Sequence, residues 1–368
     1  MKIKEIIQIL ETVAPLSLQE SYDNAGLLIG SSERDCSGII VSLDVTDAVI
    51  EEALQKNCNL IVAHHPIIFK GLKKLIGNNY VERTVISAIK NEIAIYAIHT
   101  NLDNIIEGVN KKLAEKLNLQ HCKVLLPKEG TLKKLVTFSP QKNAEEVRNA
   151  LFKSGAGTIG KYNECSFNLE GNGTFKGHEG SNPFIGKIGE RHTENETRIE
   201  VIFPGFLQNK IVASLKAAHP YEEVAYDIYA LENQREDVGS GLIGELPENL
   251  LEIELLNLLK TEFGLSVIKH TSFTRKKISR IALCGGAGFF LLPNAIAAGA
   301  QAYITSDIKY HEFFDADNKI LLADIGHYES EQFTIDLIVE FLQQKLLNFA
   351  VLKTEIITNP VQYYTGER

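Results

Sequence analysis

The chain opens with apolar residues spaced along one face of a helix. Ile3, Ile6 and Leu10 follow this spacing, and Pro15 ends it. We therefore expect an amphipathic helix over residues 2–13 that packs against a core.

Short apolar runs then alternate with segments of helical periodicity. The runs span 38–44, 59–65 and 93–99, and the helical segments span about 46–57, 80–91 and 106–118. Thr46 stands where it can cap the first of these helices. This alternation predicts a parallel, doubly wound sheet with residues 1–126 as one α/β half.

The pattern changes after Pro127. Strands are predicted at 136–140, 198–204 and 224–231 and helices at 143–153 and 207–218, and strands and turns are also expected in the glycine-rich stretch from residue 155 onward. The order β, α, β, β, α, β is that of a ferredoxin-like module, which we place at residues 127–233. The segment RIEVIFP at 198–204 is expected to be an edge strand.

The α/β alternation resumes in the last third of the chain. Apolar runs at 280–286, 302–307 and 320–326 are accompanied by a helix near 289–299 and a long helix after the last run. We expect an α/β fold in which two related halves, residues 1–126 and 234–368, form one core interrupted by an α+β insert.

Composition and charge narrow the class of protein. The 368 residues contain 44% hydrophobic and 23% charged residues, which is typical of globular chains with more than one domain. The 38 Lys and Arg against 47 Asp and Glu give a net charge of -9, which argues against a nucleic-acid partner. Because neither a signal peptide nor an 18-residue apolar run is evident, we expect a cytoplasmic protein without a membrane partner.

The cysteines limit the kind of metal site. There are five, at positions 36, 58, 122, 165 and 284, and no two have C-x-x-C spacing. Disulfides and thiolate zinc sites are therefore not expected. A metal would be held by imidazole and carboxylate groups, which suit zinc, iron or manganese.

Two adjacent histidines, His64 and His65, stand at the end of an apolar strand. In a parallel sheet this end faces the functional crevice. Because neighbouring side chains on a strand point to opposite sides, such a pair suits two metals better than one. The alternative is a structural pair hydrogen-bonded near a turn.

Two further strand ends carry the same residue types. His99 precedes Asp103 by four positions, and His327 precedes Glu331 by four at the start of a helix. Asp103 is the better ligand candidate, whereas His99 could orient a ligand or simply end the strand. His327 and Glu331 share one helix face, although on a solvent-facing helix the same spacing is an ordinary polar pair.

Together these strand ends predict a centre with two metal ions. The five ligand candidates are His64, His65, Asp103, His327 and Glu331. Such a set suits two divalent ions about 3.5–4 Å apart, with Glu331 as the bridge and a metal-bound hydroxide as nucleophile.

The sequence also resembles a known family. The segments YDNAGLLIG, AHHPIIFKG, HTNLD, SDIKYHE and DIGHYESE occur in this order. They resemble the Nif-three-like dinuclear-metal family, whose members are commonly labelled GTP cyclohydrolase type 2 homologues. The insert, with HPYEEVAYDIYAL, resembles the PII- and CutA-like module of the longer bacterial members.

The resemblance implies how the site and the assembly are built. One metal would be bound by His65 and Asp103, the other by His64 and His327, and Glu331 would bind both. The family likeness also implies a ring-shaped homohexamer, a toroid whose metal sites face an internal cavity.

Two classes of function share these ligands. One is a metal-dependent hydrolase of a small molecule or nucleotide, in which His99, Asp307 or His311 transfers the proton. The other is a metal-handling or regulatory protein whose insert senses a ligand.

Weaker signals have plainer explanations. The lysines at 70, 73 and 74 are typical of a solvated face or a phosphate contact, and nucleic-acid binding rests on them alone. The CGGAG segment at 284–288 fits a tight strand-to-helix turn better than a phosphate loop. The HPYEE segment at 219–223 fits an interface or the architecture of the insert better than catalysis.

Overall fold

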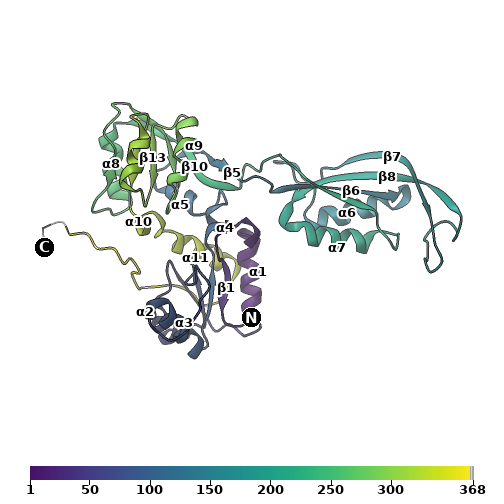
Figure 1. Ribbon diagram of the computed structural model, residues 1–368, viewed down its shortest axis with the longest axis horizontal. Coiled ribbons are helices and arrows are strands. Elements are labelled where there is room, and N and C mark those ends of the chain that lie inside the picture. Colours follow the sequence, from purple (N-terminus) through teal and green to yellow (C-terminus); the bar gives the residue numbers. More distant parts are fainter. Residues whose placement is uncertain (365, 367–368) are drawn as a thin grey trace. The chain divides into compact units, whose positions relative to one another are not determined.

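The computed structural model describes residues 1–364 and 366 and divides the chain into two compact units (Figure 1). The first unit, called the core unit below, comprises Met1–Pro127 and Glu236–Arg368, and the second, the insert, comprises Lys128–Arg235. The expected insert, residues 127–233, differs from the observed one by one residue at its start and two at its end. The α/β fold class with an interrupting module is confirmed.

The core unit contains two sheets that repeat one arrangement. The first has the order β1 (Gly26–Ile29), β4 (Ala94–Ala97), β3 (Leu60–Ala63), β2 (Ile39–Ser42), β15 (Val351–Lys353). The second has the order β11 (Lys269–His270), β14 (Leu321–Asp324), β13 (Ala302–Thr305), β12 (Ile278–Leu283), β10 (Gly239–Leu250), β5 (Gln120–Pro127). In each sheet three consecutive strands, β2–β4 or β12–β14, are parallel neighbours. Helices on both faces bury such strands completely, which explains their continuous apolar runs.

The two halves exchange their edge strands, which the sequence pattern did not predict. Strand β5 follows the first half but pairs with β10 in the second sheet, and β15 follows the second half but pairs with β2 in the first. The expectation of two contiguous halves is therefore wrong at these edges. Short edge strands carry no sign of their partner, because the pairing joins segments far apart in sequence.

Helices fill the space around the sheets. Those of the core unit are α1 (Ile3–Val13), α2 (Asp47–Gln55), α3 (Tyr80–Lys90), α4 (Thr100–Asp103), α5 (Val109–Lys116), α8 (Glu252–Glu262), α9 (Leu292–Ala297), α10 (His327–Glu331) and α11 (Thr334–Lys345). Thr46 caps α2 as predicted, because its side chain accepts a hydrogen bond from the Val49 backbone. One apolar core contains residues of both sheets, such as Val62 and Ile281, so the halves are stabilised together.

The expected helix over 106–118 is shorter and is preceded by a separate turn of helix. Gly108 lies between α4 and α5, and a Cβ atom on it would lie 1.9 Å from the Leu102 carbonyl oxygen. This close approach of the backbone needs glycine and forces the break between the two helices.

The insert has the predicted order of elements. These are β6 (Leu132–Pro140), α6 (Ala144–Ser154), β7 (Phe167–Lys176), β8 (Arg191–Pro204), α7 (Gln208–Ala218) and β9 (Tyr226–Ala230). The sheet order β7-β8-β6-β9, antiparallel throughout, is that of a ferredoxin-like module. RIEVIFP lies in β8 with neighbours on both sides, so the expected edge strand is an inner one. Its covering strand β7 has the sequence FNLEGNGTFK, whose glycines weaken the strand signal.

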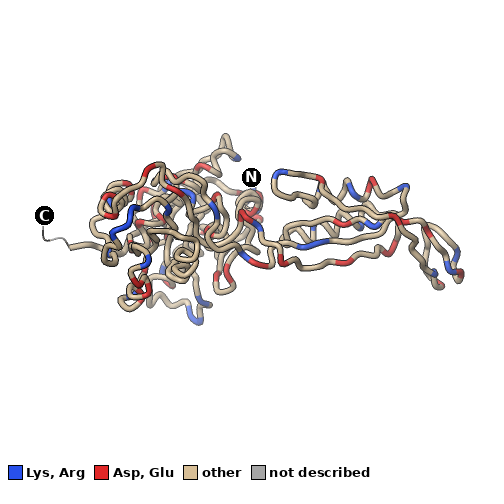
Figure 2. Tube along the Cα trace, turned by 90° about the horizontal axis from the view of Figure 1, so that it is seen from above, with Lys and Arg blue, Asp and Glu red and all other residues tan. Residues whose placement is uncertain are grey.

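The described part of the chain includes no helix both long and apolar enough to traverse a bilayer. Acidic and basic residues are interspersed along the trace of each unit (Figure 2).

Candidate metal centre

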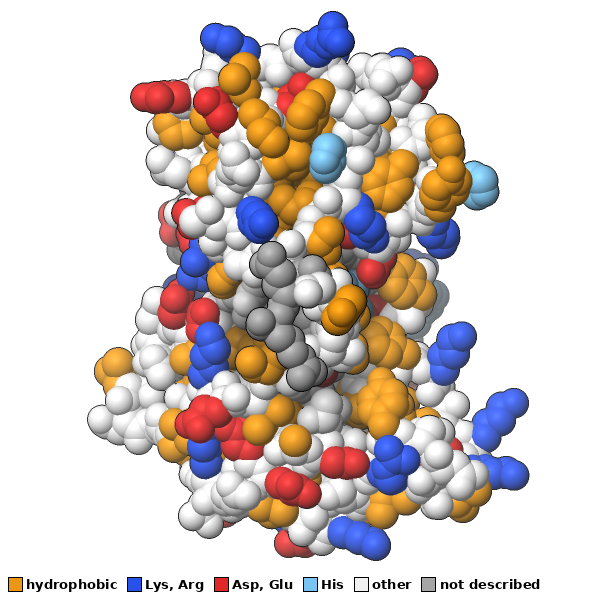
Figure 3. All heavy atoms as spheres, turned by 90° about the vertical axis from the view of Figure 1, so that its left-hand side faces the viewer, with side chains coloured by type: hydrophobic (Ala, Val, Ile, Leu, Met, Phe, Trp, Pro, Cys, Tyr) orange, Lys and Arg blue, Asp and Glu red, His pale blue; other side chains and the backbone are white. Residues whose placement is uncertain are grey.

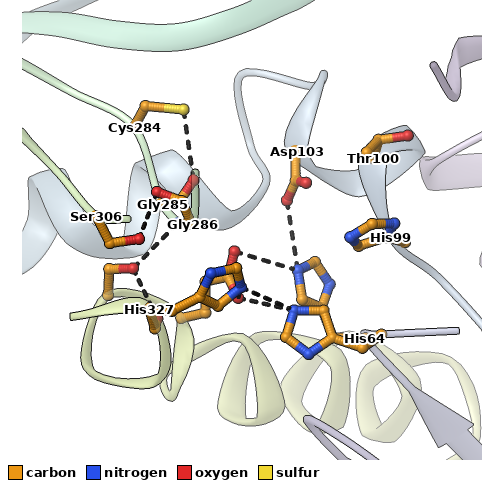
Figure 4. Close-up of polar contacts among 12 residues, drawn as sticks. His64, His99, Thr100, Asp103, Cys284, Gly285, Gly286, Ser306 and His327 are labelled. Carbon is orange, nitrogen blue, oxygen red and sulfur yellow. Dashed lines mark hydrogen bonds and ion pairs between the residues drawn. The ribbon is translucent and has the colours of Figure 1, made fainter. Parts of the chain in front are cut away.

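The five predicted ligands come from three strand ends in the core unit. His64 and His65 directly follow β3, and their backbone amides still bond to Ser42 and Leu43. Asp103 ends α4, which follows β4. The other two, His327 and Glu331, begin and end α10, which follows β14. Figure 4 shows His64, Asp103 and His327 pointing toward one another.

One group of donors surrounds one oxygen of Glu331. The Oε2 atom of Glu331 lies 2.9 Å from His65 Nε2 and 3.0 Å from His327 Nε2. The two imidazole Nε2 atoms are 3.3 Å apart. Three donor atoms therefore converge within the reach of a single small cation.

A second group faces the other oxygen of the same carboxylate. His64 Nε2 lies 3.6 Å from Asp103 Oδ1 and 3.9 Å from Glu331 Oε1. This grouping differs from the expected one, because His64 is adjacent to Asp103 and His65 to His327. The geometry therefore favours a pairing other than the implied one, in which His65 joins Asp103 and His64 joins His327. Side-chain directions at a strand end depend on rotamers, which the sequence does not specify.

Two buried atoms in the second group have no hydrogen-bond partner. Within residues 1–364 and 366, His64 Nε2 and Asp103 Oδ1 are both enclosed and unsatisfied. An unsatisfied buried polar atom is costly unless something fills its position. An imidazole nitrogen and a carboxylate oxygen facing one space form a donor set that a divalent cation satisfies.

Every histidine of the centre has its other ring nitrogen engaged. The contacts of Nδ1 are His64 to the Ile98 carbonyl at 2.9 Å, His65 to Asp44 at 2.8 Å, His327 to Asp307 at 2.7 Å and His99 to Asp23 at 2.7 Å. An Nδ1–H that donates to an acceptor leaves Nε2 as the lone-pair nitrogen. This is the usual arrangement of histidines that bind metals.

Burial and charge shift the acid–base behaviour of the ligands. Burial alone would lower the pKa of His65, but hydrogen bonds to Asp44 and Glu331 raise it to about 9. The same balance, with Asp307 in place of Asp44, raises the pKa of His327 to about 11. Without metal, both imidazoles are therefore protonated on both ring nitrogens, and so positively charged, at neutral pH.

The two ligand carboxyls are shifted in opposite directions. Burial and the nearby Glu331 raise the pKa of Asp103 well above its ordinary value. Although Glu331 is more deeply buried than Asp103, the surrounding imidazoles hold the pKa of Glu331 well below its ordinary value. Glu331 is thus the resident negative charge of the centre.

Glycine in the CGGAG turn makes room for Glu331. Gly286 has φ +63°, and a Cβ atom there would lie 2.3 Å from Glu331 Oε1. Its amide donates to Ser330 and its carbonyl accepts from Ser306. The tight-turn interpretation of this segment agrees with these bonds, and the turn also fits against the central carboxylate.

The predicted proton-transfer residues lie in different places. Asp307 has φ +57°, an uncommon backbone conformation for a non-glycine residue, and bonds to His327. A ring nitrogen of His99 lies within 4.8 Å of ring nitrogens of His64 and His65. His311 is exposed, stacks near Phe314 and does not line the cavity at the centre.

A cavity of about 680 Å³ adjoins the centre. Its apolar walls include Tyr22, Phe69, Phe290 and Tyr328. Lys269 is the one Lys or Arg among the described residues that line it, and its Nζ lies 2.5 Å from an Asp324 carboxylate oxygen. The lysines at 70, 73 and 74 are exposed and do not line it.

The carboxylates that accept hydrogen bonds from the histidines were not among the predicted site residues. Asp44 is the second residue after the end of β2. The rule that functional side chains follow the carboxyl ends of parallel strands, which pointed to His65, therefore applies to Asp44 as well. Asp23 accepts from His99 and Thr100, and these bonds outweigh burial and lower its pKa to about 2. Asp23 lies in the YDNAGLLIG segment, for which no helix or strand was predicted, so the sequence pattern did not identify it.

Comparison with known proteins decides the family. A family model described as Duf34/NIF3 (NGG1p interacting factor 3) matches residues 1–360. The chain belongs to the Duf34/NIF3 family. This confirms the resemblance drawn from the ordered segments.

Relatives in the Duf34/NIF3 family match over nearly the whole chain. A Halalkalibacterium halodurans protein named GTP cyclohydrolase 1 type 2 homolog is 37% identical over 363 residues, covering 97% of this chain and 98% of its own length. The crystal structure of a Bacillus cereus protein related to NIF3 is 36% identical with a TM-score of 0.86, covering 99% of both chains. A Staphylococcus aureus structure is 28% identical with a TM-score of 0.78, again covering 99% of both.

Replacing Gly286 with alanine tests whether the turn shapes the donor set. The new methyl group would displace Glu331, so we expect metal affinity to fall by about 10- to 100-fold. The measurement is competition with a coloured chelator. Gly264→Ala is the matched control, since Gly264 has φ +66° and open space for a Cβ. Equal affinity in the two variants would contradict the assignment.

Proposed function

We propose that this chain is a dinuclear metal-dependent hydrolase of a small molecule. The observation that carries the proposal is the convergence of imidazole Nε2 atoms on the two oxygens of one buried carboxylate, Glu331. The adjoining cavity supports a bound substrate rather than a purely structural ion.

The geometry favours one distribution of ligands. His64, Asp103 and Glu331 Oε1 would hold one divalent ion, and His65, His327 and Glu331 Oε2 the other. Zinc, iron and manganese all suit this donor set. Such ions polarise a substrate oxygen and lower the pKa of bound water toward neutrality.

The chain's own groups provide orientation and proton transfer. Asp44 and Asp307 fix the rings of His65 and His327 through their Nδ1 atoms. His99 donates from Nδ1 to the ionised Asp23, which leaves its Nε2 to take a proton from the reacting water and return it to the leaving group.

The lining of the cavity bears on the substrate class. Seven acidic residues line it, namely Glu20, Asp44, Asp103, Asp307, Asp324, Glu329 and Glu331. With Lys269 paired to Asp324, the metal ions would be the main countercharge that the site offers a triphosphate. We therefore favour a neutral or weakly charged substrate with an apolar part that contacts Tyr22 or Phe290. GTP is included among the compounds of the turnover test below.

We also propose that the chain assembles with copies of itself, as a homohexamer. Phe69, Tyr310 and Phe314 are large apolar side chains that are 55%, 75% and 67% exposed. Figure 3 shows apolar side chains among charged ones over one face of the molecule. Self-association would remove such surface from water.

Turnover with restored metal tests the proposed hydrolase. Protein stripped of metal and reloaded with zinc, iron or manganese should hydrolyse a member of a panel of nucleotides, phosphoesters and cyclic amides, GTP included. Glu331→Gln should lower this rate by at least about a hundredfold, because the amide lacks the negative charge and leaves one of the two ions without its oxygen donor. Tight metal binding with no turnover across the panel would instead favour the metal-handling alternative.

Substitution of two histidines separates proton transfer from metal binding. His99→Gln should lower kcat by roughly 100-fold while metal content stays unchanged. His311→Gln should leave both unchanged, since that side chain does not line the cavity. A loss of metal in His99→Gln would show that His99 is a ligand, contrary to the role assigned to it.

Metal uptake should release protons. The pKa of His65 is raised to about 9 and that of His327 to about 11, so both are protonated at pH 7 without metal. Metal binds the neutral rings, so affinity should rise with pH by about tenfold per pH unit for each proton displaced. Calorimetric titration in HEPES and in Tris buffer measures the protons released. Affinity independent of pH between 6 and 8 would contradict this expectation.

A further inference from the structure

The insert contains a second cavity, of about 700 Å³, that the proposed hydrolase does not use. It is lined by residues of β7 and β8, of the segment that follows β7 and of the HPYEE segment. The curled tip of the long β7–β8 hairpin is visible in Figure 1. The backbone amide of Asn182 in that tip donates to a Glu222 carboxylate oxygen at 2.8 Å. This bond ties the hairpin tip to the HPYEE segment.

Aromatic rings form much of the cavity wall. Phe175 and Phe184 lie with ring centroids 5.7 and 6.4 Å from that of Tyr221. Phe184 and a fourth ring, Phe138, already have a cation of the chain over them, Lys142 at 4.9 Å and Arg198 at 5.8 Å respectively. Phe175 and Tyr221 each have an imidazole on one side, since the His192 ring centroid lies 5.4 Å from that of Phe175 and the His219 centroid 5.1 Å from that of Tyr221. Among the described residues, no Lys or Arg lies over either ring.

A buried carboxylate lies beside these two rings. Glu196 is 8% exposed, and its Oε1 accepts a hydrogen bond from the Tyr221 hydroxyl at 2.9 Å. No Lys, Arg or His of the described chain forms an ion pair with it. A buried glutamate without a countercharge is rare, because removing a charge from water is costly.

The backbone opposite Glu196 is built to admit that carboxylate. A Cβ atom on Gly173 would lie 2.0 Å from Glu196 Oε2, so any other residue would displace the carboxylate. His219 fixes the neighbouring ring, because its Nε2 bonds to the Phe138 carbonyl and its Nδ1 accepts the Tyr221 amide. The HPYEE segment thus orders Tyr221 beside Glu196.

The balance of charge around the cavity is acidic. Five glutamates line it, at positions 170, 179, 196, 222 and 223, against Lys176 and Arg198. Arg198 is itself paired, since its Nε donates to Glu200 at 2.8 Å. An anionic ligand would therefore meet net repulsion, whereas a cation would meet both the carboxylate and the ring faces.

We propose that this cavity binds an organic cation, an amine or quaternary ammonium with apolar substituents. Its charged nitrogen would lie against Phe175 and Tyr221 and beside the Glu196 carboxylate. Ring faces attract a poorly hydrated cation, and the carboxylate supplies the missing countercharge. A strongly hydrated metal ion would gain little from the rings.

Titration of the full-length protein with choline tests the proposal. We expect one saturable site per chain, and no comparable binding of the uncharged analogue in which carbon replaces the quaternary nitrogen. Magnesium at equal concentration should not displace choline. Removing the metals of the core unit should leave choline binding unchanged, so this result is independent of the proposed hydrolase.

Variants locate the site. Glu196→Gln should weaken choline binding by at least about tenfold, and Phe175→Leu, which keeps the charge, should also weaken it. Glu194→Gln is the matched control, since Glu194 lies on the same strand, outside the cavity lining. Thermal unfolding confirms that each variant is folded. The proposal is overturned if the uncharged analogue binds as tightly as choline, if neither variant weakens binding, or if neither choline nor benzyltrimethylammonium shows saturable binding.

Discussion

The candidate metal centre depends on one interaction, the pairing of the buried Glu331 carboxylate with the imidazoles around it. Glu331 is 3% exposed, and each of its carboxylate oxygens faces a different group of imidazole and carboxyl donors. A charge buried to this extent is tolerated only when paired. In the metal-free chain the protonated His65 and His327 serve that purpose, and the same Nε2 positions suit metal ions once the protons leave. Glycine at 286 makes space for this carboxylate.

The repeated halves explain why the centre has this composition. His99 and Asp103, which follow β4, are four residues apart, as are His327 and Glu331, which follow β14, and the acidic residue of each pair ends a short helix. The two strands occupy equivalent places in their sheets. The equivalence is incomplete, since His327 contacts Glu331 whereas His99 bonds to Asp23 beside the centre. One half therefore supplies two close donors, and the other supplies one carboxyl and a candidate proton carrier.

Much of the fold and of the site was predictable from sequence, for a specific reason. Fully buried parallel strands leave continuous apolar runs, and their carboxyl ends meet at one edge, so His64, His65 and Asp103 could be placed together. The grouping of His64 with Asp103 depends on rotamers and could not be read from spacing. The partners of β5 and β15 were hidden because edge pairing is a long-range property. The ferredoxin-like order of elements in the insert was predictable. The glycines of β7 weaken its strand pattern, so the sequence did not indicate that β7 covers RIEVIFP and makes it an inner strand.

The edge-strand exchange has a consequence for the rigidity of the centre. The chain crosses from the first sheet to the second between β4 and β5, and that crossing carries Asp103. It crosses back between β14 and β15, and that crossing carries Glu331. Each candidate ligand carboxyl is thus anchored at both ends in different sheets, while His64 and His65 follow a strand at the middle of one sheet. Because the shared apolar core fixes the two sheets, the fold itself sets the spacing of the donors. Metal would then bind to a preorganised set of donors. The entropy cost of ordering these side chains is met when the chain folds, so it does not reduce the affinity for metal.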